Sequence, residues 1–387
     1  MDPQREQMMS QGSKREMIEA IHPRYLRANK AGKAQILDEF IAVTGYHRKY
    51  AIRVLRHGPK PKGLKRTGRH KVYQGEVVQF LEQIWEIYGR ICSKRLQPFL
   101  PEGITVLERW HEISLSTEIK HLLLSMSRAT IDRCLKKARF IQPLHGLSTT
   151  KPGSLLKAAI PIRTFTPWED EHPGFLEIDL VAHCGSTTDG TYLNTLTATD
   201  LATGWTECLA LADKTQSAVS QAIAQMRQDL PFALLGLDSD NGTEFINDTL
   251  YRYCMAEKIT FSRSRPYQKN DQAHVEQKNW SVVRHTVGYD RLEGSEELAL
   301  LRSIYTDLRL YINFFQPVLK LVAKVRIDGK TVRTYDQAKT PYRRVMALES
   351  LPLEVKARLT AQYVTLNPVR LRASIDAKVG KLWKIIR

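Results

Sequence analysis

Three acidic residues in the middle of the chain stand where carboxylates could bind divalent metal ions. Asp179 interrupts an apolar run, FLEIDLV, and Asp240 ends a second apolar run in LLGLDSDNG. Glu276 lies near the start of the amphipathic segment QAHVEQKNWSVV, and 35 residues separate it from Asp240. A lone carboxylate is costly to bury in an apolar strand unless a partner such as a metal ion compensates it. The three residues therefore form a candidate metal site.

The chemistry that suits three carboxylates is phosphoryl transfer by two metal ions. Such ions lie about 3.5–4 Å apart, where they activate an attacking oxygen and stabilise the departing one. Mg²⁺ prefers hard oxygen ligands and keeps waters and substrate phosphates in its shell, so few carboxylates suffice. Glu177 shares a strand face with Asp179, and Asp238 with Asp240, so each is an alternative ligand. On strand pattern alone, the choice within each pair stays open.

An α/β domain is expected to position these acids, and we place it at 173–290. From Gly174 onward, three runs rich in strand-forming residues (GFLEIDLVAHC, TYLNTLTATD and GWTECLALAD) are separated by turn residues. Helical and strand patterns then alternate, with helices at 217–229, 244–257 and 272–287 and strands at 233–237 and 259–263. Three meandering strands followed by alternating helix and strand predict a mixed five-stranded sheet with flanking helices.

Residues 1–58 are expected to form a helix-turn-helix. Apolar residues recur at helical spacing on both sides of a break at Thr44-Gly45, and a tight turn with Gly between two short helices suits that motif. The polar positions of the second helix are mostly basic, which gives the candidate DNA contacts His47, Arg48, Lys49 and Arg53. An ordinary helical hairpin with a solvated basic face is the alternative.

A basic linker at 59–74 and a second helical, helix-turn-helix module at 75–140 are expected next. The stretch RHGPKPKGLKRTGRHK holds seven Lys/Arg and no acid, a composition that cannot form a core. In the module, Ser127 is a suitable N-cap for a helix that enters a major groove. The candidate DNA contacts of that helix are Arg128, Arg133 and Lys136. A plain packing helix is the alternative.

A connector at 141–172 precedes the α/β domain, and a helical, small basic C-terminal region at 291–387 follows it. The tail interleaves Lys and Arg with apolar residues, which suits nonspecific phosphate contact or a dimer contact. Within the α/β domain, the loop RSRPYQKND leads into the helix of Glu276. We expect its cations Arg265 and Lys269 to lie beside the scissile phosphate, with a basic surface connector as the alternative.

The charge distribution predicts nucleic-acid binding at both ends of the chain. The net charge is +17, and residues 1–75 hold 17 Lys/Arg against 6 Asp/Glu while residues 319–387 hold 16 against 5. Because the middle is slightly acidic, the basic ends suit contact with a polyanion. Membrane binding is disfavoured, since neither end is a basic amphipathic helix with an aromatic face.

Several classes of protein are excluded by composition. No apolar stretch approaches the roughly 20 residues of a membrane span, and the N-terminus lacks the apolar core of a signal peptide. The five cysteines are scattered and never form a C-x-x-C pair, which argues against a disulfide framework or a cysteine-rich zinc site. We therefore expect a cytoplasmic, nucleoid-associated protein.

The acidic residues and their surroundings resemble the D,D-35-E signature of the retroviral-integrase-like transposases, as in bacterial insertion-sequence transposases. The matches are Asp179, the Asp-Asn-Gly at 240–242 with Glu244-Phe245, Glu276 with Asn279, the Arg-Pro-Tyr at 265–267, and Gln272. The resemblance implies a ribonuclease H-like core in which Asp179, Asp240 and Glu276 bind Mg²⁺ or Mn²⁺. It also implies supporting roles beside these carboxylates for Asn241 and Asn279.

The function that the resemblance implies is that of a DNA transposase or integrase. Such an enzyme binds element ends and target DNA as a homo-oligomer, and water and then a DNA 3′-hydroxyl attack a phosphodiester. A ribonuclease H-like nuclease without joining activity and a domesticated, non-catalytic DNA-binding protein are the rival hypotheses. All three acids are present, which disfavours the second rival.

Overall fold

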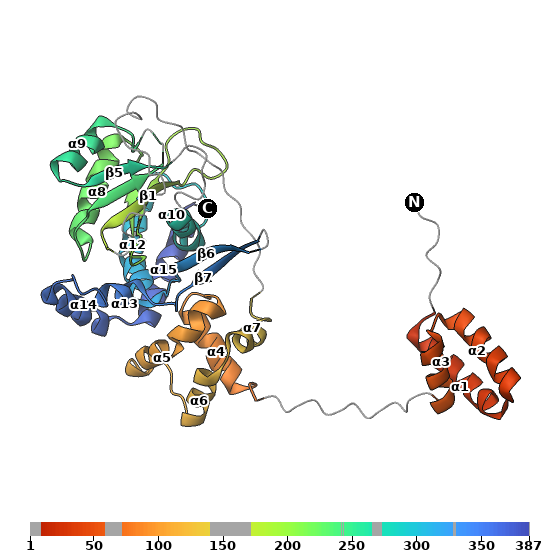
Figure 1. Cartoon of the computed structure of the whole chain (residues 1–387). Helices are drawn as coiled ribbons and strands as arrows, with labels where there is room; N and C mark the ends of the chain where they lie inside the picture. The colour runs from red at the N-terminus through yellow and green to blue at the C-terminus, as the bar shows by residue number, and fades with distance from the viewer. Residues whose placement is uncertain are drawn as a thin grey trace. The chain divides into compact units, whose positions relative to one another are not determined.

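The computed structural model describes residues 9–58, 72–139, 172–240, 242, 244–264, 273–327 and 330–386. The chain divides into two compact units, Met1–Val72 and Tyr73–Arg387 (Figure 1). Each unit has its own cluster of buried apolar side chains. In the described ranges, every helix is too short or too polar to span a bilayer.

The first unit folds into α1 (Gln11–Arg27), α2 (Lys30–Thr44) and α3 (Arg48–His57). α2 ends where Gly45 adopts the left-handed conformation (φ 67°), a common helix end for which glycine has no steric penalty. The core of the unit consists of Ile18, Tyr25, Ile36, Leu37, Phe40, Ala51 and Leu55. The helices and the break at Thr44-Gly45 lie where the sequence predicts them, while DNA binding by α3 stays a prediction.

The second unit begins with α4 (Glu76–Ile87), α5 (Ser93–Arg109), α6 (Thr117–Ser125) and α7 (Arg128–Cys134). Ser127 caps α7 as expected, because its Oγ accepts a hydrogen bond from Thr130 N at 3.2 Å. The sequence pattern does not predict α5. Pro98 and Pro101 lie inside this helix, and proline inside a helical pattern normally ends it.

The helices of residues 75–139 are anchored to the rest of the second unit. Tyr311 Oη donates to Ile87 O at 2.5 Å, and Gln316 Nε2 donates to Tyr88 O at 2.8 Å. Their apolar side chains also join the same buried cluster as those of the sheet. This region therefore packs as part of the second unit.

The described part of the second unit centres on a mixed five-stranded sheet in the order β3-β2-β1-β4-β5. The strands are β1 (Phe175–Ala182), β2 (Asn194–Asp200), β3 (Thr206–Leu211), β4 (Gly236–Ser239) and β5 (Thr260–Arg263). β1, β2 and β3 are antiparallel neighbours, whereas β4 pairs parallel with β1 and with β5. The predicted mixed sheet, with its three meandering strands first, is confirmed.

The sheet has one mainly apolar face and one polar face. Paired residues of neighbouring strands point to the same face, so Ile178 shares a face with Ala198 while Asp179 shares the other with Thr197. α8 (Gln216–Asp229) and α9 (Asp248–Ala256) lie on one side of the sheet and α10 (Ala273–Lys278) on the other (Figure 1). Backbone hydrogen bonds from α10 to Glu177 show that α10 covers the polar face.

The remaining elements are η1 (Asn279–Arg284), α11 (His285–Val287), α12 (Ser295–Phe315), β6 (Leu321–Ile327), β7 (Lys330–Tyr335), α13 (Pro341–Met346), α14 (Leu353–Thr365) and α15 (Pro368–Ile386). The expectation of a helical region at 291–387 is incomplete, because β6 and β7 form an antiparallel hairpin. Their sequences, LVAKVRI and KTVRTY, contain several β-branched residues, which favour strands.

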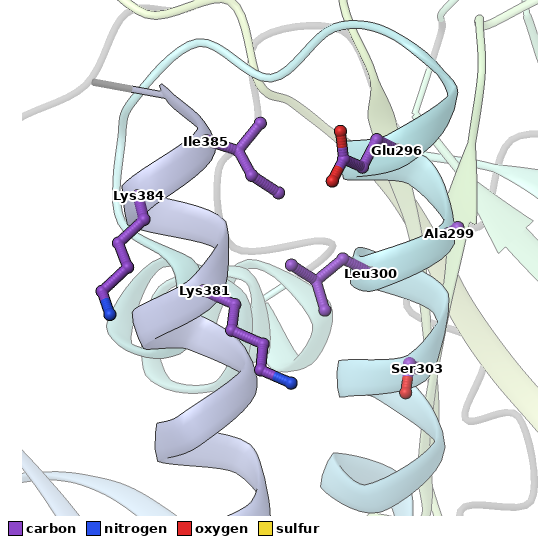
Figure 2. A pocket seen from close by; sticks show the side chains of 7 residues that line it. All are labelled: Glu296, Ala299, Leu300, Ser303, Lys381, Lys384 and Ile385. Carbon is purple, nitrogen blue, oxygen red and sulfur yellow. The ribbon is translucent and has the colours of Figure 1, made fainter.

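α15 packs along α12, so the basic tail is part of the second unit. Lys378 Nζ and Ser374 Oγ both donate to Asp307 Oδ2 of α12 at 2.6 Å. Near the end of the pair, Leu300 and Ile385 line a hollow of about 550 Å³ between the two helices (Figure 2).

α12 also covers the free edge of the sheet. Asn313 Oδ1 accepts from Thr206 N at 2.9 Å, and Asn313 Nδ2 donates to Thr206 O at 2.8 Å. Arg309 Nε donates to both carboxylate oxygens of Glu207 at 2.7 Å. An edge strand presents unpaired backbone N–H and C=O groups. At the edge of β3, Asn313 satisfies two of these groups, and the ion pair of Arg309 with Glu207 attaches α12 to the strand.

Replacing Asn313 by Ala is expected to destabilise the second unit by about 2 kcal/mol or more, because two backbone groups of Thr206 lose their partner in a buried setting. The thermal midpoint of this unit should fall, and the Thr206 amide hydrogen should exchange faster. Thr306→Ala on the same helix is the control, since its hydroxyl makes only an exposed bond to Arg302 O. Equal midpoints for the two variants would contradict the role of Asn313.

Candidate active site

Asp179 and Asp240 occupy equivalent positions on two neighbouring parallel strands. β1 pairs with β4 so that Glu177 lies opposite Asp238. Asp179 lies two residues after Glu177 in β1, and Asp240 lies two residues after Asp238, just past the end of β4. Because side chains alternate along a strand, both aspartates share the face of Glu177 and Asp238. The polar face of the sheet therefore carries both aspartates at the β1–β4 junction.

Glu177, the alternative to Asp179, ties β1 to the start of α10. Its Oε2 accepts hydrogen bonds from the backbone N–H groups of His274 and Val275, each at 3.0 Å. The first N–H groups of a helix have no partner within the helix, so a buried carboxylate at this point fixes where α10 begins. Glu177 is 0% exposed, and its contacts suit a positioning role.

Asp238, the alternative to Asp240, is also engaged inside the protein. Its Oδ1 accepts a hydrogen bond from Ser262 Oγ on β5 at 2.5 Å, and the residue is 0% exposed. Asp179 and Asp240 are both partly exposed. Within each pair, accessibility therefore favours the residue that the D,D-35-E pattern selects.

Asp179 lies in a field of negative charge. Burial and the negative charge of Asp240 raise the pKa of Asp179 to about 7, with a further contribution from Glu276. Two donors oppose this rise: Leu180 N at 2.8 Å from Oδ1 and Asn279 Nδ2 at 2.6 Å from Oδ2. Like charges raise a carboxyl pKa because they disfavour its ionised form. Asp240 and Glu276 therefore both act electrostatically on Asp179.

Asp240 is held at the turn that follows β4. Burial raises its pKa to about 6, and the charge of Glu244 adds to the rise, whereas Lys214 lowers it. Gly242 N donates to Asp240 Oδ1 at 2.8 Å and also lowers the pKa. A Cβ at Gly242 would lie 2.7 Å from the Glu244 carboxyl carbon and 2.9 Å from Asp240 Oδ1, so any other residue at this position would displace these carboxyl groups.

The donor set fits a hard divalent cation. Carboxylate oxygens are the ligands that Mg²⁺ and Mn²⁺ prefer, and a cation would relieve the repulsion at Asp179. As the side chains are placed, the described residues contain no ready group of three metal-binding side chains. Glu276 is exposed, and its negative charge contributes to the raised pKa of Asp179.

The helix of Glu276 continues as a π-helix, η1, directly after α10. π-helical segments are rare and often occur at functional sites. Asn279, the first residue of η1, donates to Asp179, and Arg284, the last, donates from Nη2 to Ala182 O at 2.7 Å. The two bonds fix η1 along β1.

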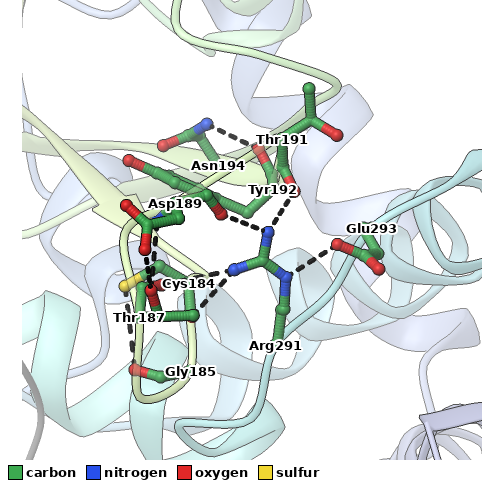
Figure 3. A network of polar contacts seen from close by, with 9 residues as sticks. All are labelled: Cys184, Gly185, Thr187, Asp189, Thr191, Tyr192, Asn194, Arg291 and Glu293. Carbon is green, nitrogen blue, oxygen red and sulfur yellow. Dashed lines mark hydrogen bonds and ion pairs between the residues drawn. The ribbon is translucent and has the colours of Figure 1, made fainter.

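Arg291, which the sequence reasoning missed, organises the turn between β1 and β2. Its guanidinium donates to the carbonyl oxygens of Cys184, Thr187, Asp189 and Thr191 at 2.7–3.3 Å (Figure 3). It also pairs with Glu293 at 2.7 Å. All four acceptors in the turn are backbone groups, so no residue type in the sequence could have indicated this role.

The N-terminal DNA-contact candidates cluster at the start of α3. His47 is the N-cap, and its Nδ1 accepts from Lys49 N at 3.3 Å. Arg48 forms an exposed ion pair with Asp38 of α2. Lys49 and Arg53 are exposed as well, so all three cations are accessible to a ligand.

The candidates on and after α7 are exposed. Arg128, Arg133 and Lys136 all face solvent, and Arg133 Nη2 donates to Thr130 Oγ1 at 3.1 Å. The predicted site residues Asn241, Arg265 and Lys269 lie outside the described residues, as does Gln272.

Three comparisons relate the chain to known proteins. Residues 169–269 match the integrase core domain family. The chain is 42% identical to the uncharacterized protein y4rM of Sinorhizobium fredii (strain NBRC 101917 / NGR234) over 336 residues, which cover 87% of this chain and 96% of that protein. The HTLV-2 integrase catalytic core domain, solved with magnesium in its dimeric form, is 15% identical with a TM-score of 0.28, covering 41% of this chain and 93% of that one.

The sheet order and the integrase core match define a protein with a ribonuclease H-like core. The chain belongs to the family of DDE transposases and integrases. The family and the fold expected from the D,D-35-E pattern are thereby confirmed.

If Glu177 fixes the start of α10, Glu177→Ala should increase hydrogen exchange at the His274 and Val275 amides by roughly tenfold or more, since each loses a charged acceptor. Glu177→Gln keeps an acceptor oxygen at the same place and should preserve much of the protection. Protection that is unchanged in Glu177→Ala would show that this carboxylate does not hold the helix.

Proposed function

We propose that this protein is a DNA transposase or integrase that cuts phosphodiesters at the ends of a mobile element and joins the 3′-hydroxyl to target DNA. The observation that carries the proposal is the placement of Asp179 and Asp240 on one face of two neighbouring parallel strands, β1 and β4. There, the charges of Asp240 and Glu276 both raise the pKa of Asp179. Such repulsion is costly in the protein alone and is relieved by divalent cations.

Asp179, Asp240 and Glu276 are the residues that would hold Mg²⁺ or Mn²⁺. Bound there, the ions would activate the attacking oxygen and stabilise the departing one. The chain supplies the orientation: each oxygen of Asp179 accepts one hydrogen bond, from Leu180 N and from Asn279 Nδ2. These bonds fix the plane of the carboxylate and leave further lone pairs for a ligand.

The proposed partner is double-stranded DNA, bound by the basic ends of the chain. Because transposition joins two element ends, we include a homo-oligomer on DNA in the proposal. In the sequence, the segment RSRPYQKND precedes α10, and its residues 265–271 lie outside the described residues. Its Arg265 and Lys269 remain our candidates for contacts to the scissile phosphate.

Asp179→Asn, Asp240→Asn and Glu276→Gln should each lower the rates of both nicking and joining by at least about a thousandfold, roughly 4 kcal/mol of transition-state stabilisation. The assay uses labelled duplexes that end in the element's own terminal sequences, with Mg²⁺ or Mn²⁺, and scores cut and joined products. Binding of the same duplex without metal should change by less than about threefold, because each substitution keeps the size of the side chain and removes a single charge.

Asp248→Asn is the matched control for these substitutions. Asp248 lies on α9, where it forms an exposed pair with Arg252, so its replacement removes one carboxylate without touching the site. Cutting without any joining by the wild type would favour the ribonuclease H-like nuclease instead. Full activity in any of the three acid variants would remove that residue from the site.

Recognition of the element ends is expected to depend on α3. Lys49→Gln and Arg53→Gln in the full chain should reduce the preference for terminal over random duplexes. Each lost phosphate contact should also reduce the slope of log affinity against log salt by about 0.9. Arg27→Gln, which removes an exposed cation from α1, is the control. If all three variants behave alike in fluorescence anisotropy, α3 is not the reading helix.

A further inference from the structure

A cavity of about 250 Å³ lies beside the helix of Glu276, between the α4–α5 turn, η1, α12 and α15. Its lining residues include five basic side chains and no acidic one: Arg90, Arg95, Lys278, His285 and Arg372. They come from positions far apart in the sequence. The fold, and not a local charge run, therefore gathers positive charge at this point.

The basic side chains act on one another across the cavity. Burial lowers the pKa of His285, and the positive charges of Arg372 and Arg90 lower it further. Arg95 and Lys278 line the same cavity. In the part of the chain that is described, no acidic residue pairs with Lys278. Converging cations without an acid between them form an electrostatic site for an anion.

Two of the cations have acidic neighbours outside the cavity. Arg90, which follows α4, pairs with Glu86 of α4 at 3.0 Å. Arg372 pairs with Asp376 at 3.0 Å, and both lie on α15. All four side chains are at least 36% exposed, and exposed pairs of this kind contribute little free energy. An anion in the cavity can therefore compete for both guanidinium groups.

The wall that carries Arg90 is built in an uncommon conformation. Gly89 (φ 72°) and Arg90 (φ 56°) are both left-handed, which is rare for a residue with a side chain and is retained where its surroundings fix it. The turn is fixed on α12, because Gln316 Nε2 donates to Tyr88 O at 2.8 Å. The backbone thus directs Arg90 to the cavity at a conformational cost.

We propose that this cavity binds a backbone phosphate of the DNA substrate. A volume of 250 Å³ equals that of roughly eight water molecules, which suits a phosphate group and is small for a whole nucleotide. Trp280 lines the same cavity and is 60% exposed, so its ring is available to stack on the attached sugar or base. The site would anchor DNA to the α4–α5 turn and to the catalytic helix at once.

This inference rests on the proposed function, because the phosphate is taken to belong to the DNA that the enzyme cuts. Lys278 directly precedes Asn279, which donates to Asp179. A phosphate held by Lys278 would therefore lie along the same helix as the proposed metal ligand Glu276. Its role would be to position the strand, with no part in the chemical step.

The test is phosphate-ethylation interference with the full chain on an element-end duplex in the absence of divalent metal. The wild type should require one or two adjacent phosphates that Lys278→Gln and Arg90→Gln no longer require. Each variant should bind about tenfold more weakly. Arg358→Gln, an exposed cation of α14 outside the cavity, removes the same charge and should keep the full pattern.

An interference pattern that is identical in the wild type and both cavity variants would overturn the inference while leaving the proposed function intact. Saturable binding of inorganic phosphate that is lost in Lys278→Gln, without any change at the DNA phosphates, would also overturn it in favour of a free anion. Failure of the wild type to bind or cut the duplex would refute the proposed function itself, and the DNA phosphate with it.

Discussion

Like-charge repulsion between Asp179 and Asp240 is the constraint around which the second unit is arranged. The parallel pairing of β1 with β4 places both on one face at the same level of the sheet, and burial raises the pKa of each. Backbone N–H groups and the Asn279 amide stabilise the charged forms in part. The protein alone does not neutralise these acids, which leaves a site matched to cations.

The polar face of the sheet is covered by helices that form specific hydrogen bonds with it. The carboxylate of Glu177 on this face accepts hydrogen bonds from the first backbone N–H groups of α10. η1 then continues along β1 by bonds from both of its ends. At the far edge, Asn313 of α12 satisfies the backbone of β3. The helices thus hold the polar face in place by hydrogen bonds as well as by apolar packing.

Much of this arrangement could be predicted from the chain. Alternating strand patterns and the Asp-Asn-Gly turn locate the sheet and its acids, because strand period and turn chemistry are local properties. α5 could not be predicted from pattern, because its two prolines argue against a helix. The role of Arg291 and the cation-lined cavity could not be predicted from the sequence either. Arg291 contacts backbone carbonyls, and the cavity is lined by residues as distant in the sequence as Arg90 and Arg372. Only the tertiary fold brings these groups together.

The most direct measurement is a crystal structure of the protein with Mn²⁺, using the anomalous signal of the metal. We expect a peak between the carboxylates of Asp179 and Asp240, with the Glu276 side chain turned toward it and Asn279 still bonded to Asp179. Mn²⁺ bound elsewhere, or Asp179 and Asp240 unliganded at saturating metal while Glu276 remains turned away, would contradict a three-carboxylate metal site.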